Sequence, residues 1–370
     1  MKNKSIIITI IIILLIISVG LFFYKNRGNN LKLKESQGIN IIPTMNDKIA
    51  NDSSWCGTFQ LVWNDMKNEI VKKDIEFNPQ LDIVANLNKE DFNESMISED
   101  YYYKVYGLKS LELKEQIEKE IKSKFNQTSD ILDNFDWSDE GLDDQNDPYT
   151  RRYFLYTMLY RKFEFLQKFD KLNNDKFGEE YKNVKYFGID ENSKESLGDQ
   201  IDVLYYNSKE DFAILINTKT DDEVIFCKNP EGNSFNEIYN NMNNKSDQYE
   251  GSKTFGKLDK FKAPNLTFNE KREYTELANK KFDTADPKYN KAEIKKAIQT
   301  IEFSLDENGG KIKSESAIDL GVKATAIGPG NLKDEPRYFY VDDTFAIFLR
   351  EKGKTKPYFA GRINDITKFQ

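Results

Sequence analysis

The sequence contains no histidine and only two cysteines among its 370 residues. The absence of histidine excludes Ser-His-Asp and Cys-His catalysis, as well as any zinc site that uses imidazole ligands. The two cysteines, Cys56 and Cys227, are too few to form a disulfide framework. We expect two buried, unpaired thiols, with a single disulfide as the alternative.

The sequence also lacks the signatures of common enzyme classes. It has no phosphate-binding loop, no dinucleotide glycine fingerprint and no nucleophile elbow. None of its 62 acidic residues is marked as half of a glycosidase carboxylate pair. The net charge is −8 and no basic stripe with interleaved aromatic residues occurs, which argues against nucleic acid as a partner. We therefore expect a protein that is not an enzyme and has no cofactor.

One long apolar run is present, at the N-terminus. Residues 6–23 form an unbroken stretch of eighteen residues, preceded by Lys2 and Lys4. As a helix this run would span roughly 27 Å, close to the thickness of a bilayer core. It predicts a single N-terminal transmembrane signal-anchor within residues 1–24, with the rest of the chain exported to the cell surface. A cleaved signal, which would make the protein secreted, is the alternative.

The remaining chain is predicted to form one domain behind a tether. Residues 25–50 are polar and rich in Asn and Lys, which is typical of a linker. Residues 51–370 are long enough to enclose a substantial core, since 38% of the sequence is apolar. We expect a single domain there, acting as a monomer.

The most informative stretch is residues 294–310. Ile301, Phe303 and Leu305 alternate with polar residues, and an acidic turn then ends in two glycines. This pattern predicts a half-buried strand that opens into a conformationally free segment. It also resembles, without a gap, the strand and hinge that precede the reactive loop of serpins, with Glu307 and Gly309 at hinge positions.

Three further stretches resemble serpins in the family's order. They are a central-sheet strand at 155–162 with Phe165 where tryptophan is usual, a stretch at 263–270 leading into a helix through Leu277, and a closing hairpin at 339–350 and 359–363. The resemblance implies an α+β fold with a large, mostly antiparallel central sheet, two smaller sheets and helices packed behind. It also implies a reactive loop at about residues 309–338, either exposed or inserted.

Local patterns add several elements. We expect a strand at 101–108 and an amphipathic helix at 112–125. The resemblance to serpins implies two more elements, a helix behind the central sheet within residues 52–70 and a strand at 131–136. Three strands at 201–206, 212–217 and 224–227 would form a small barrel-like sheet. In serpins a long helix crosses the front of the central sheet, but only residues 137–152 are available for it. We expect that helix to be absent or reduced to a stub.

The hinge is followed by a segment with a period of two. Gly310, Ile312, Ser314 and Ser316 form a small or apolar row, whereas Lys311, Lys313 and Glu315 belong to a charged row. The first row would face the protein interior if the segment entered the sheet. We expect the charged row to face water, because the covering helix is predicted to be missing.

The resemblance implies inhibition of a protease by loop cleavage and strand insertion. It places the scissile bond fourteen residues after Gly309, at Lys323–Ala324, with Lys333 as a second candidate. Lysine there would suit an extracellular trypsin-like serine protease, and a cysteine protease is also conceivable. The alternative is a non-inhibitory surface binding protein in which the loop is permanently inserted.

Two other groups of residues are candidates for a site. Thr157 and Gln299 match the polar cluster that controls sheet opening in serpins; neither titrates near neutrality, so we expect no histidine-type pH trigger. A weak calcium-loop spacing is present, but its eighth position is acidic and no helix pair flanks it. We expect a solvated acidic loop there rather than a metal site. The residues with that spacing are Asp136, Ser138, Glu140, Asp144 and Asp147.

Overall fold

The computed structural model describes residues 38–137, 153–285, 291–316 and 336–370. All of them belong to one compact unit, Glu35–Gln370, and a second unit, Met1–Lys34, lies outside the described residues. The predicted anchor at residues 1–24 is therefore not described. Within the described ranges, no helix is both long and apolar enough to cross a membrane.

The central sheet has five strands, of which the inserted segment is the middle one. Residues 309–316 pair antiparallel with the strands on both sides, in the register Ser314 to Ile301 and Ser314 to Leu159. In spatial order the strands are β13 (Leu266–Glu273), β16 (Ile298–Asp306), β17 (Gly309–Ser316), β4 (Tyr153–Glu164) and β3 (Tyr102–Leu108). The predicted strands at 101–108, 155–162 and 301–305 are thus present.

A seven-stranded sheet packs against one end of the central sheet. It contains the closing hairpin β19–β20 and the three predicted strands of the small sheet, extended by one to three residues. In spatial order its strands are β1 (Asn40–Ile41), β2 (Ser53–Cys56), β20 (Phe359–Ile363), β19 (Phe345–Glu351), β11 (Asp222–Lys228), β10 (Asp211–Asn217) and β9 (Ile201–Ser208).

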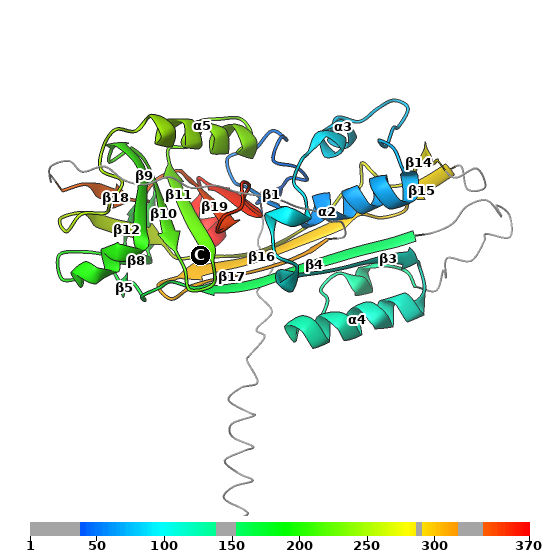
Figure 1. The fold of residues 1–370 in the computed structure, drawn as a ribbon, viewed down its shortest axis with the longest axis horizontal. Coiled ribbons are helices and arrows are strands. Elements are labelled where there is room, and N and C mark those ends of the chain that lie inside the picture. The colour runs from blue at the N-terminus through cyan, green and yellow to red at the C-terminus, as the bar shows by residue number, and fades with distance from the viewer. Residues whose placement is uncertain (1–37, 138–152, 286–290, 317–335) are drawn as a thin grey trace, which may run out of the picture. The chain divides into compact units, whose positions relative to one another are not determined.

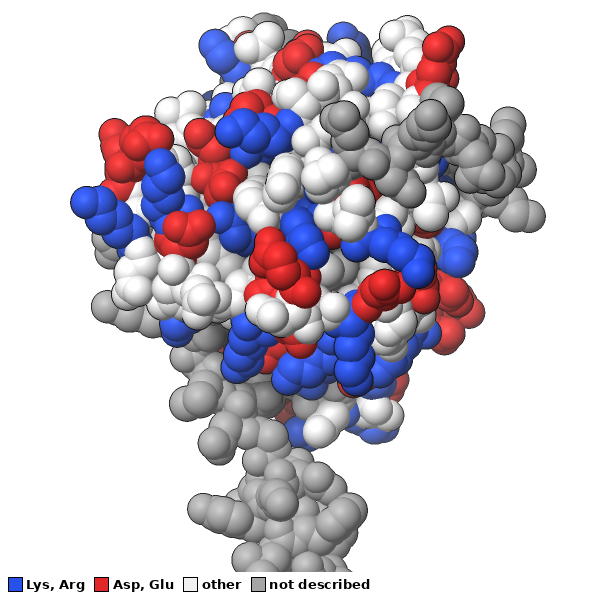
Figure 2. Space-filling model, turned by 90° about the vertical axis from the view of Figure 1, so that its left-hand side faces the viewer, with Lys and Arg blue, Asp and Glu red and all other residues white. Residues whose placement is uncertain are grey.

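Smaller sheets complete the strand content of the described residues. A four-stranded sheet joins β18 (Tyr338–Tyr340), β12 (Lys260–Pro264), β8 (Tyr186–Ile189) and β5 (Asp170–Lys171). Two hairpins pair β14 (Lys280–Asp283) with β15 (Lys291–Ile294), and β6 (Asp175–Phe177) with β7 (Tyr181–Val184). Acidic and basic side chains are interspersed over the face at the β5–β18 end (Figure 2).

Helices cover the two faces of the central sheet. Helix α2 (Thr58–Asp65) continues as a π-helix to Val71 and packs on β4 and β17. Helix α3 (Asp82–Lys89) lies on the same side of the sheet as α2, and α4 (Leu111–Phe125) lies on the opposite side (Figure 1). Helix α5 (Phe235–Gln248) contacts β9. Both predicted helices, within 52–70 and at 112–125, are therefore present. Short 3₁₀ turns occupy Glu94–Met96, Glu99–Tyr101, Leu132–Asn134, Glu195–Gln200 and Ile366–Phe369.

Three local predictions are wrong. The stretch 131–136 contains a 3₁₀ turn instead of a strand. The hydroxyl of Ser129, two residues before Ile131, accepts hydrogen bonds from the amides of Ile131 and Leu132, which favours a turn over extended backbone. The stretch after residue 263 forms β13 and then turns, without a helix through Leu277.

The third concerns the tether. Residues 38–50 belong to the domain, since Ile39, Ile41 and Met45 are buried and β1 pairs with β2. Met45 N also donates to the buried carboxylate of Glu90. The apolar residues of this segment are spaced too irregularly to predict a helix or a strand, yet they are buried in the domain. The domain therefore begins before residue 51.

Candidate functional site

The inserted strand β17 is the candidate functional site, and its entry is set by the hinge. Gly309 has φ +142°, and a Cβ there would lie 2.2 Å from the carbonyl oxygen of Phe163. Only glycine permits this backbone and this close approach. Glu307 is buried just before it, with Lys168 and Lys171 at 3.4 and 3.3 Å. Burial raises the pKa of Glu307, but its own amide and Lys171 offset this and the net pKa is lowered.

One face of β17 packs on helix α2, as the small and apolar row predicted. Ile312, Ser314 and Ser316 are all buried. The hydroxyl of Thr58 lies 2.9 Å from both Ser314 Oγ and Ser316 Oγ, and Ser314 also donates to the carbonyl of Thr300 at 2.8 Å. The small hydroxyl side chains of Ser314 and Ser316 therefore contact Thr58, the first residue of α2, through hydrogen bonds.

The predicted sheet-opening cluster is part of this same network. Gln299 is buried; its amide donates to Thr58 Oγ1 at 3.1 Å and to the carbonyl of Cys56 at 3.0 Å, and it accepts from Tyr274 at 2.7 Å. Thr157 is buried opposite Ser316 in the strand ladder. The structure thus places Thr157 and Gln299 beside the face of β17 that carries Ile312, Ser314 and Ser316, called the insertion face below. Thr58 and Tyr274 belong to the same polar cluster and were not predicted as members.

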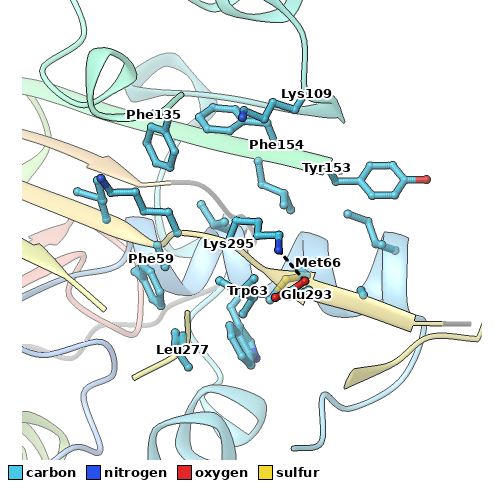
Figure 3. Close-up of a pocket in the computed structure, with 18 of the residues that line it drawn as sticks. Phe59, Trp63, Met66, Lys109, Phe135, Tyr153, Phe154, Leu277, Glu293 and Lys295 are labelled. Carbon is cyan, nitrogen blue, oxygen red and sulfur yellow. Dashed lines mark ion pairs between the residues drawn. The ribbon is translucent and has the colours of Figure 1, made fainter. Parts of the chain in front are cut away.

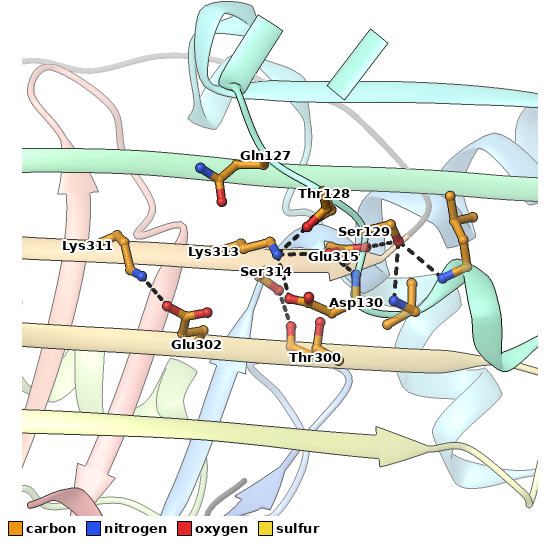
Figure 4. Close-up of polar contacts among 12 residues, drawn as sticks. Gln127, Thr128, Ser129, Asp130, Thr300, Glu302, Lys311, Lys313, Ser314 and Glu315 are labelled. Atoms are coloured by element: carbon orange, nitrogen blue, oxygen red, sulfur yellow. Dashed lines mark hydrogen bonds and ion pairs between the residues drawn. The ribbon is translucent and has the colours of Figure 1, made fainter. Parts of the chain in front are cut away.

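The charged face of β17 is not open to water, which corrects the prediction. Lys313 is 6% exposed and Glu315 is fully buried. Residues 127–132 pass over this face (Figure 4), and helix α4 extends the cover over β3 and β4. The covering helix was expected to be absent or reduced to a stub in residues 137–152. Of these, residues 138–152 lie outside the described residues. The cover comes from a different segment, which the sequence pattern did not reveal.

Each charge on this face has specific partners (Figure 4). Lys313 Nζ donates to the carbonyl of Thr128 at 3.0 Å and to Asp130, and lies 3.5 Å from Glu315. Glu315 accepts from Ser129 Oγ at 2.7 Å, from the amide of Asp130 at 2.9 Å and from Tyr156 OH at 2.9 Å. Lys311, nearer the hinge, pairs with Glu302. These partners make burial of the charges tolerable.

The electrostatics of this cluster follow from burial. Burial raises the pKa of Glu315, and Lys313 only partly offsets this. Burial would lower the pKa of Lys313, but Glu315 and Asp130 outweigh it and the net pKa is raised. Burial, with Glu315 alongside, holds the pKa of Tyr156 well above its usual range. The pKa of Glu315 is therefore moved toward neutral pH, whereas the pKa values of Lys313 and Tyr156 are moved further above it.

A second buried ionic cluster fixes the neighbouring strand β4. The Arg161 guanidinium pairs with Asp222 at 2.7 Å and with Glu351 at 2.6 Å, and stacks 3.7 Å from the centre of the Tyr101 ring. Asp222 and Glu351 belong to the seven-stranded sheet. The cluster therefore ties β4 to that sheet, which limits how far β4 can move away from β17.

Several predicted site residues fall outside the described part of the chain. The reactive bond Lys323–Ala324 lies outside the described residues. So do Ser138, Glu140, Asp144 and Asp147 of the calcium-loop candidate; in the described part of the chain no acidic, cysteine or histidine group is arranged to hold a metal ion. Cys56 and Cys227 are buried and unpaired, as predicted. Burial raises the pKa of both thiols, that of Cys227 to about 11.

The chain is similar to several solved structures of serpins, at low sequence identity. No protein-family model matches the chain, and no curated protein does. Among solved structures it is similar to a cleaved Serpin 42Da at 12% identity and a TM-score of 0.42. The match covers 68% of this chain and 64% of that chain, so this chain spans less than two thirds of that protein's length. It is similar to the thermophilic serpin tengpin in the latent state at 13% identity and a TM-score of 0.47, covering 86% of this chain and 92% of that one. It is similar to Serpin48 of the insect Tenebrio molitor at 14% identity and a TM-score of 0.35, covering 72% and 77%.

The chain has a serpin-like α+β fold. Its five-stranded sheet carries the loop segment as the middle strand, its second sheet contains the closing hairpin, and Phe165 is buried at the predicted place.

Proposed function

We propose that this chain is a serpin-like surface binding protein in which β17 is a resident strand, present before any cleavage. The observation that supports this most is the burial of Lys313 and Glu315 beneath residues 127–132, with a partner for each charge, in an intact chain. A strand that enters the sheet only after cleavage would have to pass both charges under this cover. Leaving a buried charge unpaired on the way costs several kcal/mol, which slows insertion.

A resident strand leaves little movement for a protease trap. Trapping requires the cleaved loop to enter the sheet and to carry the attached protease along. If the bond at Lys323–Ala324 is cut, eight residues are already inserted and only seven remain before the cut. At ~3.3 Å per residue they add roughly 23 Å of strand. The free energy released on cleavage would be correspondingly small.

The experiment that tests this proposal is cleavage of the intact protein with trypsin. We expect cleavage within residues 317–335 without an SDS-resistant complex, and a midpoint of thermal unfolding that stays within a few degrees. A covalent complex at the summed mass contradicts the proposal. So does a rise in midpoint of about 10 °C or more, which corresponds to several kcal/mol for a domain of this size.

A protease inhibitor that acts by loop cleavage and strand insertion is the second candidate. A cavity in line with β17 favours this candidate. The neighbouring strands β4 and β16 extend past the level of Ser316, as far as Tyr153 and Ile298, and both of these residues line the cavity. Inserted residues could occupy that space after a cut at Lys323–Ala324. For this candidate, Lys323→Asp abolishes trypsin trapping, and unchanged trapping excludes that bond.

The cellular location is part of the proposal. The apolar run at residues 6–23 supports an N-terminal membrane anchor with the domain outside the cell. Labelling of intact cells with a membrane-impermeant amine reagent tests this, because lysines such as Lys168 and Lys171 are exposed. Labelling only after lysis contradicts export.

A further inference from the structure

A cavity of about 460 Å³ lies beyond Ser316, the last described residue of β17, between the ends of β4 and β16. Its walls come from both faces of the sheet: helix α2 and its continuation behind, residues 131–136 in front, and the ends of β4, β15 and β16 at the sides (Figure 3). The volume is within the range of small-molecule sites in proteins, about 300–1,000 Å³.

The body of this cavity is apolar. Phe59, Trp63 and Phe154 present aromatic rings to it, and Val62 and Leu155 add aliphatic surface. Val62 and Leu155 are only partly buried although they sit between two layers of the domain. Both residues pack against the core, and the apolar surface that they leave uncovered on the cavity side favours an apolar occupant over water.

Charged side chains stand at the rim of the cavity. Lys109, Lys295 and Lys296 line it together with the carboxylates of Asp136 and Glu293, and Lys296 also pairs with Glu273 at 3.6 Å. Lys295 Nζ lies 2.8 Å from Glu293 (Figure 3), and its side chain is half exposed. An anionic group at the mouth would meet the Lys295 ammonium while remaining partly hydrated.

We propose that this cavity binds an amphipathic carboxylate, with the hydrocarbon chain between α2 and the end of β4 and the carboxylate beside Lys295. The inference rests on the proposed function, in which no strand inserted after cleavage fills the space between β4 and β16. It names the ligand class of the binding protein as fatty-acid-like anions.

The test uses quenching of tryptophan fluorescence by ω-bromo-octanoate. Of the three tryptophans, Trp63 lines the cavity, whereas Trp55 and Trp137 do not. The full-length chain is held in lipid nanodiscs, with empty nanodiscs as the blank and the free probe measured by equilibrium dialysis. We expect saturable quenching that Trp63→Phe removes, and about ten-fold weaker binding of ω-bromo-octanol, which lacks the charge.

A matched pair of variants tests the rim. Lys295→Gln should weaken the carboxylate about ten-fold and leave the alcohol unchanged. Lys257→Gln is the control, because Lys257 forms a similar surface pair with Glu195 at 2.9 Å and does not line the cavity. Ala297→Phe, which fills the cavity, should abolish binding of both probes.

Three results overturn the inference: no saturable quenching, quenching that survives Trp63→Phe, or equal affinity for the alcohol. Its failure is distinguishable from failure of the proposed function. If trypsin cleavage displaces the probe and raises the unfolding midpoint, the resident-strand function fails while the cavity assignment stands. If the midpoint stays flat and no probe binds, the cavity assignment fails alone.

Discussion

Lys313 and Glu315 lie on the same face of β17 with their charged groups 3.5 Å apart, and both are buried beneath residues 127–132. A salt bridge of this kind does not by itself stabilise a fold, because desolvation opposes the attraction. Loss of one partner is different. Without Lys313 the fully buried Glu315 carboxylate has no cation beside it among the described residues, and without Glu315 the buried Lys313 keeps only Asp130, which is partly exposed. The pair therefore fixes which strand fills this place in the sheet more than it adds stability.

A double-mutant cycle measures this relationship. Lys313→Met and Glu315→Leu should each lower the free energy of unfolding by about 3–5 kcal/mol, whereas the double variant should lose much less than the sum. Denaturant unfolding of the residue 31–370 fragment gives these values. Lys219→Met is the control, because the Lys219–Glu164 pair is exposed and should matter by less than about 1 kcal/mol. Additive losses would contradict the coupling.

Stability should depend on pH through Glu315. Its pKa is raised in the folded state from an ordinary value of 4.5, so the folded state binds this proton more tightly than the unfolded chain does. The contribution of Glu315 is fully present below pH 4.5 and is lost as the pH rises through the folded pKa. The unfolding free energy of the wild type relative to Glu315→Gln should therefore fall as the pH rises above 4.5. A difference that grows with pH would refute the assignment.

Ser314→Arg should expel the strand from the sheet. Ser314 is fully buried against Thr58, and an arginine would place an unpaired cation beneath the sheet. We expect faster trypsin cleavage within residues 309–316 than in the wild type. Lys311→Arg keeps the charge and the partner Glu302 on the opposite face, and should cleave at the wild-type rate. Equal protection of both variants would argue against this register.

Gly309→Ala should destabilise the hinge. The substitution forces alanine into a φ of +142° with its Cβ 2.2 Å from a backbone carbonyl, at a cost of about 1–3 kcal/mol or more. Gly107→Ala on β3 is the control, since its Cβ would meet only Leu113 at an ordinary 3.6 Å. The midpoint of thermal unfolding should be clearly lower for Gly309→Ala than for Gly107→Ala. Equal midpoints would contradict a hinge backbone that requires glycine at residue 309.

The insertion face could be predicted because its signal is local. Alternation in β16 and β17 fixes which side chains share a face, and the face that carries Ile312 and Ser314 follows from residue size and polarity alone. The three strands of the second sheet were found within one to three residues, because each is a short run bounded by a polar turn. The closing hairpin was predicted from its resemblance to serpins, and β19 begins at Phe345, within the stretch 339–350.

The cover over the charged face could not be predicted in the same way. Ser129 and Asp130 lie in a polar stretch with no periodicity, and their partners Lys313 and Glu315 are more than 180 residues away. Charged residues on one strand face ordinarily mean solvent, and only the three-dimensional contacts show that these are buried. The cavity beyond Ser316 is hidden for the same reason, since its walls come from distant segments.

Hydrogen exchange of the β17 amides in the intact, uncleaved chain tests the central claim most directly. In a resident strand paired on both sides, the amides of residues 311–316 should exchange as slowly as those of β16, Ile301 and Phe303 included. Exchange of these amides at the rate of an unstructured peptide, with β16 still protected, would contradict a resident strand and favour a loop that enters the sheet only after cleavage.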